Sequence, residues 1–145
     1  MIPREVVVDA SVAVKWLLAD VRGEADVPAA NQVLLRVREG EVRLFQPAHF
    51  VLEIAAVLAR ESPRRAARDL AELQLVEMSV VDEPEVVHLA LQLAVRHGQH
   101  VFDTLYHAVA LSRPEALLVT ADERYWRAAR HDGRVVRLSD FATLH

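Results

Sequence analysis

The sequence predicts an α/β protein whose mainly parallel sheet is covered by helices on both faces. Short apolar, β-branched runs alternate along the chain with longer segments whose apolar residues recur at helical spacing. Hydrophobic residues make up 52% of the 145 residues, enough for a core, while 4 Gly and 6 Pro leave little room for linkers. We therefore expect a single domain over residues 1–145.

The first half of the chain contains two expected strands, at residues 5–8 and 42–45, each followed by helices. The helices are expected directly after Asp9, at residues 24–39, at 49–60 and from Ser62 to about residue 75. Ser62 and Pro63 resemble an N-cap followed by proline at the first helical position.

The second half continues the alternation. Strands are expected at residues 78–81, 116–119 and 135–137, and helices at about 83–97, 102–110 and 122–130. Asp82 with Glu85 resembles a capping box. Gly98 follows the first of these helices, and glycine commonly ends a helix.

Composition narrows the classes of function. The chain contains no Cys, which excludes a disulfide framework, a thiolate zinc site and a cysteine nucleophile. The net charge of -4 is not typical of proteins that bind nucleic acid through bulk positive charge. No apolar run approaches the roughly 20 residues of a membrane span, and charged residues interrupt the apolar amino-terminal stretch. We expect a cytoplasmic protein without a targeting signal.

Four acidic residues lie at the ends of apolar strands or within apolar helices: Asp9, Glu53, Asp103 and Asp122. Asp9 and Asp122 follow the first and fourth strands and should project from the same sheet edge, where ligands of parallel sheets gather. Each acid has a structural interpretation when taken alone. Asp9 and Asp122 could cap helices, Asp103 could favour its helix dipole, and Glu53 could lie at a solvent boundary.

Together, the four carboxylates predict a shared cation site. Hard divalent ions such as Mg²⁺ and Mn²⁺ prefer oxygen ligands, lower the pKa of water and stabilise charge on phosphate oxygens. Close carboxylates without such an ion would repel one another, and some would take up protons.

Four stretches of the sequence, in order, resemble the motifs of PIN-domain proteins, especially VapC-type toxins. The first is Val7-Val8-Asp9-Ala10-Ser11, and the second is Pro47 with Glu53 six residues later. The third is Phe102-Asp103-Thr104-Leu105-Tyr106, and the fourth is Leu118-Val119-Thr120-Ala121-Asp122-Glu123-Arg124. The resemblance extends over about residues 5–140.

This resemblance implies an α/β/α sandwich and a Mg²⁺- or Mn²⁺-dependent endoribonuclease. It implies that Asp9, Glu53, Asp103 and Asp122 are catalytic and bind the metal. Ser11 and Thr120 match polar positions beside the first and fourth acids, and we expect these two residues and Arg124 to contact substrate. Toxin members usually form homodimers and are neutralised by a small VapB-like antitoxin protein. Many members carry Asn where this chain has Ala56, which puts the support of the site in doubt but not its ligands.

Several other features have two interpretations. Arg127 and Arg130 could guide RNA together with Arg124, or lie on a solvated face. The same holds for Arg64, Arg65 and Arg68. Lys15 could touch substrate or antitoxin, or face solvent. His100, Asp103 and His107 could form a transition-metal site, although surface or packing histidines are the better interpretation. Trp16, Phe50 and Tyr106 are expected in the core.

Competing functions fit the sequence less well. A phosphorylated receiver domain needs an acidic pair after the first strand and a lysine after the last, but Asp9 precedes Ala10, and Lys15 is the only lysine. A haloacid-dehalogenase-like phosphatase needs a second Asp where Ser11 stands. A PIN-like binding module without turnover and a PIN nuclease without an antitoxin remain open alternatives.

Overall fold

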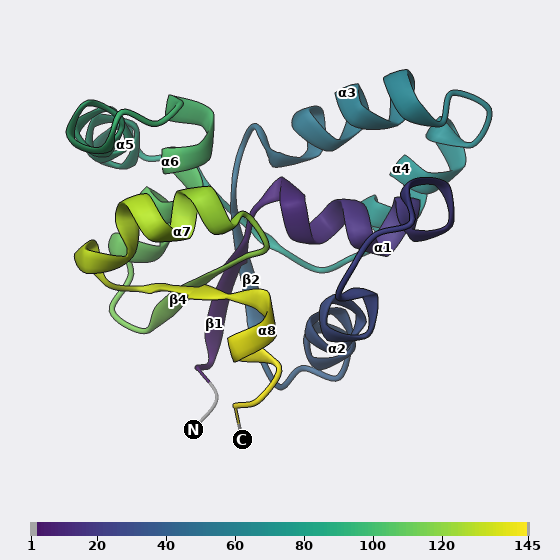
Figure 1. The fold of residues 1–145 in the computed structure, drawn as a ribbon, viewed down its shortest axis with the longest axis horizontal. Helices are drawn as coiled ribbons and strands as arrows, with labels where there is room; N and C mark the ends of the chain where they lie inside the picture. Colours follow the sequence, from purple (N-terminus) through teal and green to yellow (C-terminus); the bar gives the residue numbers. More distant parts are fainter. Residues whose placement is uncertain (1–2, 145) are drawn as a thin grey trace.

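The computed structural model describes residues 3–144 and confirms the predicted α/β class (Figure 1). Its strands form one parallel sheet in the order β3-β2-β1-β4-β5. The strands are β1 Glu5–Val8, β2 Arg43–Pro47, β3 Ser79–Val81, β4 Ala116–Thr120 and β5 Val135–Arg137. β1 occupies the centre because Val6, Val7 and Val8 are fully buried and can pack against helices on both faces.

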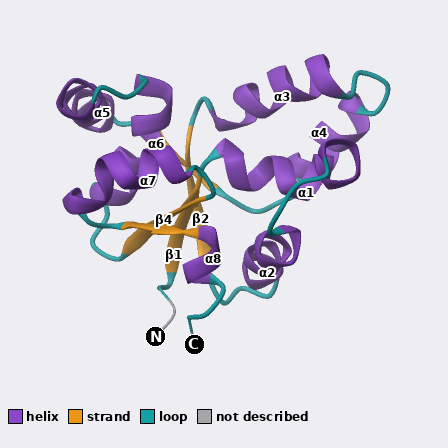
Figure 2. Ribbon diagram, viewed as in Figure 1, coloured by secondary structure: helices purple, strands orange, loops and turns teal. Residues whose placement is uncertain are grey.

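Helices cover both faces of this sheet (Figure 2). They are α1 Ala10–Arg22, α2 Val27–Arg38, α3 Phe50–Glu61, α4 Ala66–Gln74, α5 Pro84–His97, α6 Val101–Leu111, α7 Glu123–Ala129 and α8 Leu138–Phe141. α6 packs on β1, β2 and β4 and is backed by α5, while α1 packs on the sheet with α2 and α3 against its outer side. The result is the expected three-layer sandwich.

Strand register determines what lies at the carboxyl edge of the sheet. β1 and β4 pair along their whole length, with Val8 opposite Val119, so Asp9 follows β1 beside Thr120. β1 and β2 pair only through Glu5 with Arg43 and Val6 with Leu44. Parallel strands end together, so residues that follow β1 and β4 emerge on one edge.

Three of the expected helix starts differ from the structure, and α2 begins at Val27 rather than at residue 24. Pro84 is the first residue of α5, and the cap is Glu83 rather than Asp82, because proline forces the residue before it into extended backbone. α4 begins at Ala66, since Pro63 and the two arginines after it form a turn instead of a first helical turn.

None of the helices in the described range is long and apolar enough to cross a membrane.

Candidate active site at the carboxyl edge of the sheet

Asp9 occupies the centre of this edge, directly after β1. Its backbone precedes α1, but its side chain turns to neighbouring hydroxyl groups and does not cap that helix. Ser11 Oγ donates a hydrogen bond to one carboxylate oxygen, and Thr120 Oγ1 donates to the other at 2.5 Å. These two hydroxyls in turn accept from the backbone N–H groups of Ala121, at 2.9 Å, and Asp122, at 3.0 Å. Asp9 is therefore fixed to the loop between β4 and α7.

Asp122 is the N-cap of α7. One of its carboxylate oxygens accepts from the backbone N–H of Tyr125 at 3.0 Å, so the capping role considered from the sequence is real. The cap does not compete with a role at the edge, because it fixes the rotamer of a carboxylate whose charge influences Asp9 and Asp103. The same side chain thus caps the start of α7 and contributes charge to the acidic group at the edge.

Glu53 and Asp103 enter the site from two different helices. Glu53 lies in the first turn of α3 and Asp103 in the first turn of α6. The Tyr106 hydroxyl, one turn after Asp103, donates a hydrogen bond to Glu53 Oε1, and His49 Nε2 lies 3.9 Å from the same oxygen. The Tyr106 ring is buried as expected, but its hydroxyl holds a site residue, which the sequence analysis missed.

The electrostatics show that the four acids influence one another. Burial raises the pKa of Asp9 to about 6; the bonds from Ser11 and Thr120 oppose that rise, and the charges of Asp122 and Asp103 add to it. Desolvation also raises the pKa of Asp103, followed by the charges of Glu53 and Asp122. No arginine or lysine is among the causes for either carboxyl group. The fold thus brings the four predicted acids within electrostatic reach: Asp122 and Asp103 act on Asp9, Glu53 and Asp122 act on Asp103, and His100 and His49 partly offset the charge at Asp103.

The chemistry of this cluster suits a hard divalent cation. Within residues 3–144, no three acidic or histidine side chains lie close enough as placed to hold one ion directly. Mg²⁺, however, is usually bound by one or two carboxylates, with waters and substrate phosphates completing its shell. Four carboxylates that supply only oxygen donors, two of them with raised pKa values, fit that mode of binding.

Gln46 supports the site in a way that sequence reasoning missed. Its buried side chain donates to the carbonyl of Val8 at 2.8 Å and accepts from the N–H of Val8 at 2.9 Å. Val8 lies where β1 and β2 have diverged, so this amide replaces missing backbone pairing immediately before Asp9. Buried glutamine in a strand was the available signal, because an unpaired buried amide is costly.

The structure corrects the expectations for Lys15 and decides between the two interpretations of Arg65. Lys15 neither contacts solvent nor is free for substrate: it is buried, pairs with Glu24 at 3.0 Å and donates to the Ala25 carbonyl at 2.7 Å. Arg65 is likewise not part of a free basic patch, because it pairs with Asp20 at 2.6 Å. Arg124, in contrast, is exposed in the first turn of α7, two residues after Asp122.

The structure supports packing rather than a transition-metal site for the histidines near Asp103. His107 is fully buried, with Nδ1 2.9 Å from the Tyr125 hydroxyl and Nε2 2.7 Å from the Gly133 carbonyl. It therefore cannot join His100 and Asp103 around a transition metal. His100 is instead the N-cap of α6, and its Nδ1 accepts from the N–H of Phe102.

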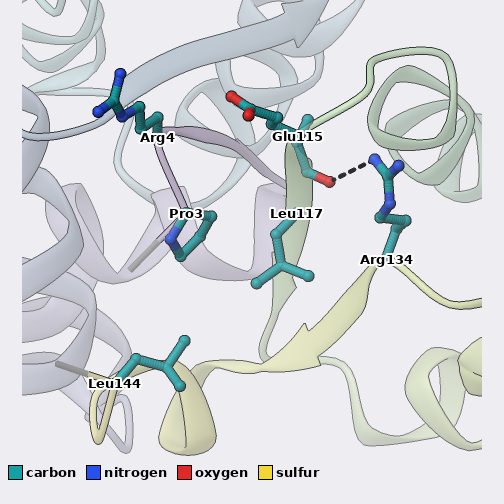
Figure 3. A pocket seen from close by; sticks show the side chains of 7 residues that line it. Pro3, Arg4, Glu115, Leu117, Arg134 and Leu144 are labelled. Carbon is teal, nitrogen blue, oxygen red and sulfur yellow. Dashed lines mark hydrogen bonds between the residues drawn. The ribbon is translucent and has the colours of Figure 1, made fainter. Parts of the chain in front are cut away.

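A pocket at the opposite edge of the sheet is not part of this site. Figure 3 shows it at the amino ends of β1 and β4, between Pro3, Leu117 and Leu144. The guanidinium of Arg134 points to backbone carbonyls, with the Arg113 oxygen at 2.5 Å and the Ala116 oxygen at 3.3 Å. The guanidinium of Arg134 is thus engaged by carbonyls of the same chain. Asp9 and Asp103 at the carboxyl edge, in contrast, are not influenced by any arginine or lysine among the described residues.

Comparison with known proteins agrees with this geometry. The family model of the PIN domain matches residues 6–131, which include all four acids. The chain belongs to the PIN domain family. No curated protein matches the chain in sequence.

Solved structures share the PIN-domain fold at low identity. PAE2754 from Pyrobaculum aerophilum is 21% identical, with a TM-score of 0.66 over 95% of this chain and 92% of that one. VapC20 from Mycobacterium tuberculosis, a Sarcin-Ricin loop cleaving toxin, is 18% identical, with a TM-score of 0.60 over 84% and 94%. DNA-bound VapBC from Salmonella typhimurium is 15% identical, with a TM-score of 0.62 over 95% and 99%.

Proposed function

We propose that this PIN domain is a metal-dependent endoribonuclease and the toxin of a VapBC-type toxin–antitoxin pair. The observation that carries the proposal is the group of carboxylates at the carboxyl edge, where neither arginine nor lysine offsets the raised pKa values of Asp9 and Asp103. Buried carboxylates without a positive partner destabilise the folded state, and a bound cation would offset that free-energy cost. The VapC20 toxin, which cleaves the Sarcin-Ricin loop, has the same fold.

Asp9, Glu53, Asp103 and Asp122 would hold Mg²⁺ or Mn²⁺. When bound, the ion supplies positive charge to the reacting phosphate and favours the deprotonation of water for attack on phosphorus. The chain's own contribution is orientation. Ser11 and Thr120 fix both oxygens of Asp9, and Tyr106 fixes Glu53, so the carboxylates need little rearrangement when they bind.

The hydroxyls of Ser11 and Thr120 support a positioning role more directly than the substrate contact expected from the sequence. Each already donates to Asp9 and accepts from a backbone N–H. Arg124 has no such engagement with Asp9 and is exposed beside the cluster, so it is the better candidate for contact with an RNA phosphate.

The proposed protein partners are a VapB-like antitoxin and a second copy of this chain. Two structures of the same fold, from Salmonella typhimurium and Rickettsia felis, are VapBC complexes bound to DNA. α5 exposes Val87, Leu91 and Val95 at four-residue spacing, an apolar stripe that a second copy could cover. We place the protein in the cytoplasm, where RNA is available.

The test is cleavage of a mixed pool of structured RNAs by purified, antitoxin-free protein with Mg²⁺, with Mn²⁺ and with chelator. An Asp9→Asn protein prepared identically serves as the control for contaminating ribonuclease. We expect cleavage that requires metal and is lost in Asp9→Asn. Cleavage that persists in chelator or in Asp9→Asn would contradict the proposal. RNA or protein binding without any turnover would favour the binding-module alternative.

An Asp9→Asn protein also permits a test of the antitoxin. If expression of the wild-type chain arrests growth and expression of Asp9→Asn does not, co-expression of the short protein encoded beside it should restore growth. Metal-dependent cleavage without growth arrest would favour a PIN nuclease that has no antitoxin.

A further inference from the structure

A row of four aromatic rings leads from the acidic cluster to the protein surface. It begins at Tyr106, whose hydroxyl bonds Glu53, and His49 lies next, with ring centroids 4.8 Å apart. Phe102 follows, nearly parallel to His49, at a centroid distance of 5.4 Å and an interplanar angle of 24°. His100 lies 5.0 Å from Phe102 at 29°. These separations are typical of stacked aromatic rings.

Burial changes steadily along this row. Tyr106 is 1% exposed and His49 is half-buried, whereas Phe102 is 53% exposed and His100 is also exposed. The inner rings are thus fixed in the fold, while the outer two present ring surface to solvent. Tyr106 shares the core with Phe50, which packs edge-on against it at 6.3 Å.

Backbone groups of Phe102 hold the two histidine rings that stack with its side chain. The N–H of Phe102 donates to His100 Nδ1 at 3.2 Å, and the carbonyl of Phe102 accepts from His49 Nε2 at 3.1 Å. Both bonds join the residues of the row to one another and to the first turn of α6. A surface whose rings are already ordered loses little conformational entropy when it binds another flat ring.

The row of aromatic rings starts next to the carboxylates of the candidate active site. Phe102 and Asp103 are adjacent in α6, and Glu53 is bonded to the first ring of the row. Because His49 stacks on Phe102 and its Nε2 lies 3.9 Å from Glu53 Oε1, a flat group stacked on the outer rings would lie within a few ring widths of the Glu53 carboxylate. A phosphate at the acids and a nucleobase on the rings would belong to the same or neighbouring nucleotides.

The negative charge of the protein favours contact with a nucleobase over contact with the phosphate backbone as the main source of affinity for RNA. The chain carries a net charge of -4, and the cluster adds local negative charge, so the backbone of RNA gains little from it. Stacking of bases on aromatic side chains does not depend on net charge, and every base offers a ring face. Duplex RNA hides those faces, whereas unpaired loops expose them.

We propose that Phe102 and His100 form a stacking platform for an unpaired nucleobase beside the scissile phosphate. This inference rests on the proposed nuclease function and makes it more specific: the substrate must present an unpaired base next to the bond that is cut. The platform supplies binding and register, while the carboxylates supply the chemistry.

The test uses binding rather than cleavage. Nine-nucleotide single-stranded RNAs, each with the fluorescent base 2-aminopurine at a different position, are titrated with the full-length Asp9→Asn protein in Mg²⁺. Stacking quenches 2-aminopurine, so we expect quenching at a restricted set of positions. A Phe102→Leu change in the same background keeps apolar volume and removes the ring. It should weaken binding about tenfold and abolish the quenching.

Two further variants separate stacking from other effects. His100→Asn retains a side chain that caps helices but lacks the ring, and should weaken binding less than Phe102→Leu does. Leu75→Ala alters the most exposed apolar side chain among those described, outside the site, and should bind as the parent does. The fully paired duplex of the same sequence should show no quenching.

The proposal is overturned if no RNA is quenched, if Phe102→Leu binds and quenches as its parent does, or if the duplex binds as tightly as the single strand. The nuclease proposal fails separately. Quenching that depends on Phe102, found together with wild-type protein that cleaves no RNA, would leave the platform standing and contradict only the catalytic function.

Discussion

The two ends of β1 carry acidic residues in opposite environments. Glu5, at the amino end, is buried and accepts from Arg113 at 2.8 Å and from Arg43 at 3.0 Å. The bond from Arg113 contributes most to lowering the pKa of Glu5. Asp9, just past the carboxyl end, meets only hydroxyls and other acids, and its pKa is raised to about 6.

The difference is between a carboxylate that two arginines neutralise and one that only hydroxyl groups contact. Arg113 also lies over the ring of Phe45, 3.7 Å from its centroid, so the Glu5 cluster is complete within the chain. The hydroxyls of Ser11 and Thr120 fix the orientation of the Asp9 carboxylate, but neither arginine nor lysine neutralises its charge. The proposed cation site would explain why the fold neutralises the acid at the start of β1 and leaves the acid just after β1 without a basic partner.

The largest expected difference between the two ends is in catalysis. Asp9→Asn should lower RNA cleavage about a thousandfold or more, because a metal-ligand carboxylate contributes several kcal/mol to the transition state. Glu5→Gln should cleave like the wild type wherever both proteins are folded. Initial rates on one RNA, normalised to the folded fraction measured by circular dichroism, provide the comparison. Equal rates for wild type and Asp9→Asn would remove the distinction.

Gln46→Ala should show how far the support of Asp9 extends into the sheet. The change leaves the N–H and carbonyl of Val8 without partners in a buried strand, which should lower the free energy of unfolding by about 2–4 kcal/mol. Denaturant titration measures this loss. Gln99→Ala, which removes a single bond to the His97 carbonyl, should lose less than about 1 kcal/mol. Equal losses would show that Gln46 has no special role.

The pH dependence of stability should have opposite slopes at the two ends. The folded protein holds the Asp9 proton up to about pH 6 while the ordinary value is 3.8, so the free energy of unfolding falls as the pH rises between these values. The pKa of Glu5 is lowered from 4.5, so its contribution is present above that pH and is lost as the pH falls.

Each pH dependence of the free energy of unfolding should disappear when the residue that causes it is replaced. Asp9→Asn should remove the decline between about pH 4 and pH 6, and Glu5→Gln should remove part of the loss at lower pH. Denaturant titrations of the three proteins at intervals of half a pH unit measure both effects. A wild-type decline that Asp9→Asn leaves intact would assign it to another group.

The smallest expected effect concerns Tyr106. Tyr106→Phe keeps the buried ring and removes the bond to Glu53, so cleavage should fall about threefold to tenfold with a nearly unchanged melting temperature. The loss should appear in kcat at saturating metal, since the carboxylate is still present but less well oriented. A variant that keeps full kcat at every metal concentration would show that the hydroxyl serves packing alone.

The fold could be predicted because its signals are local. Apolar β-branched runs such as Val6 to Val8 and helical spacing in α6 depend on neighbours a few residues away. Asp9 and Asp122 could be placed on one edge because parallel strands end together, whereas Glu53 and Asp103 lie in helices and were joined to them by the family resemblance. The family resemblance then narrowed the chemistry that such an edge could support.

The supporting contacts could not be predicted because their partners are distant in sequence. Thr120 binds Asp9 from 111 residues away, Tyr106 binds Glu53 from 53, and Gln46 binds Val8 from 38. The sequence also gave no sign that Lys15 would be buried beside Glu24, because a lone lysine in a helix usually faces water. Such pairings are fixed by tertiary packing.

The most direct test of the account is the free energy of unfolding of wild type and Asp9→Asn at pH 7.5, each with chelator and with Mn²⁺. In chelator, Asp9→Asn should be the more stable by about 1–3 kcal/mol, because it removes an uncompensated charge. Mn²⁺ should stabilise the wild type in proportion to its binding and have a much smaller effect on Asp9→Asn. A wild type that gains nothing from metal, or an Asp9→Asn protein less stable than wild type in chelator, would contradict the claim that this edge is built to receive a cation.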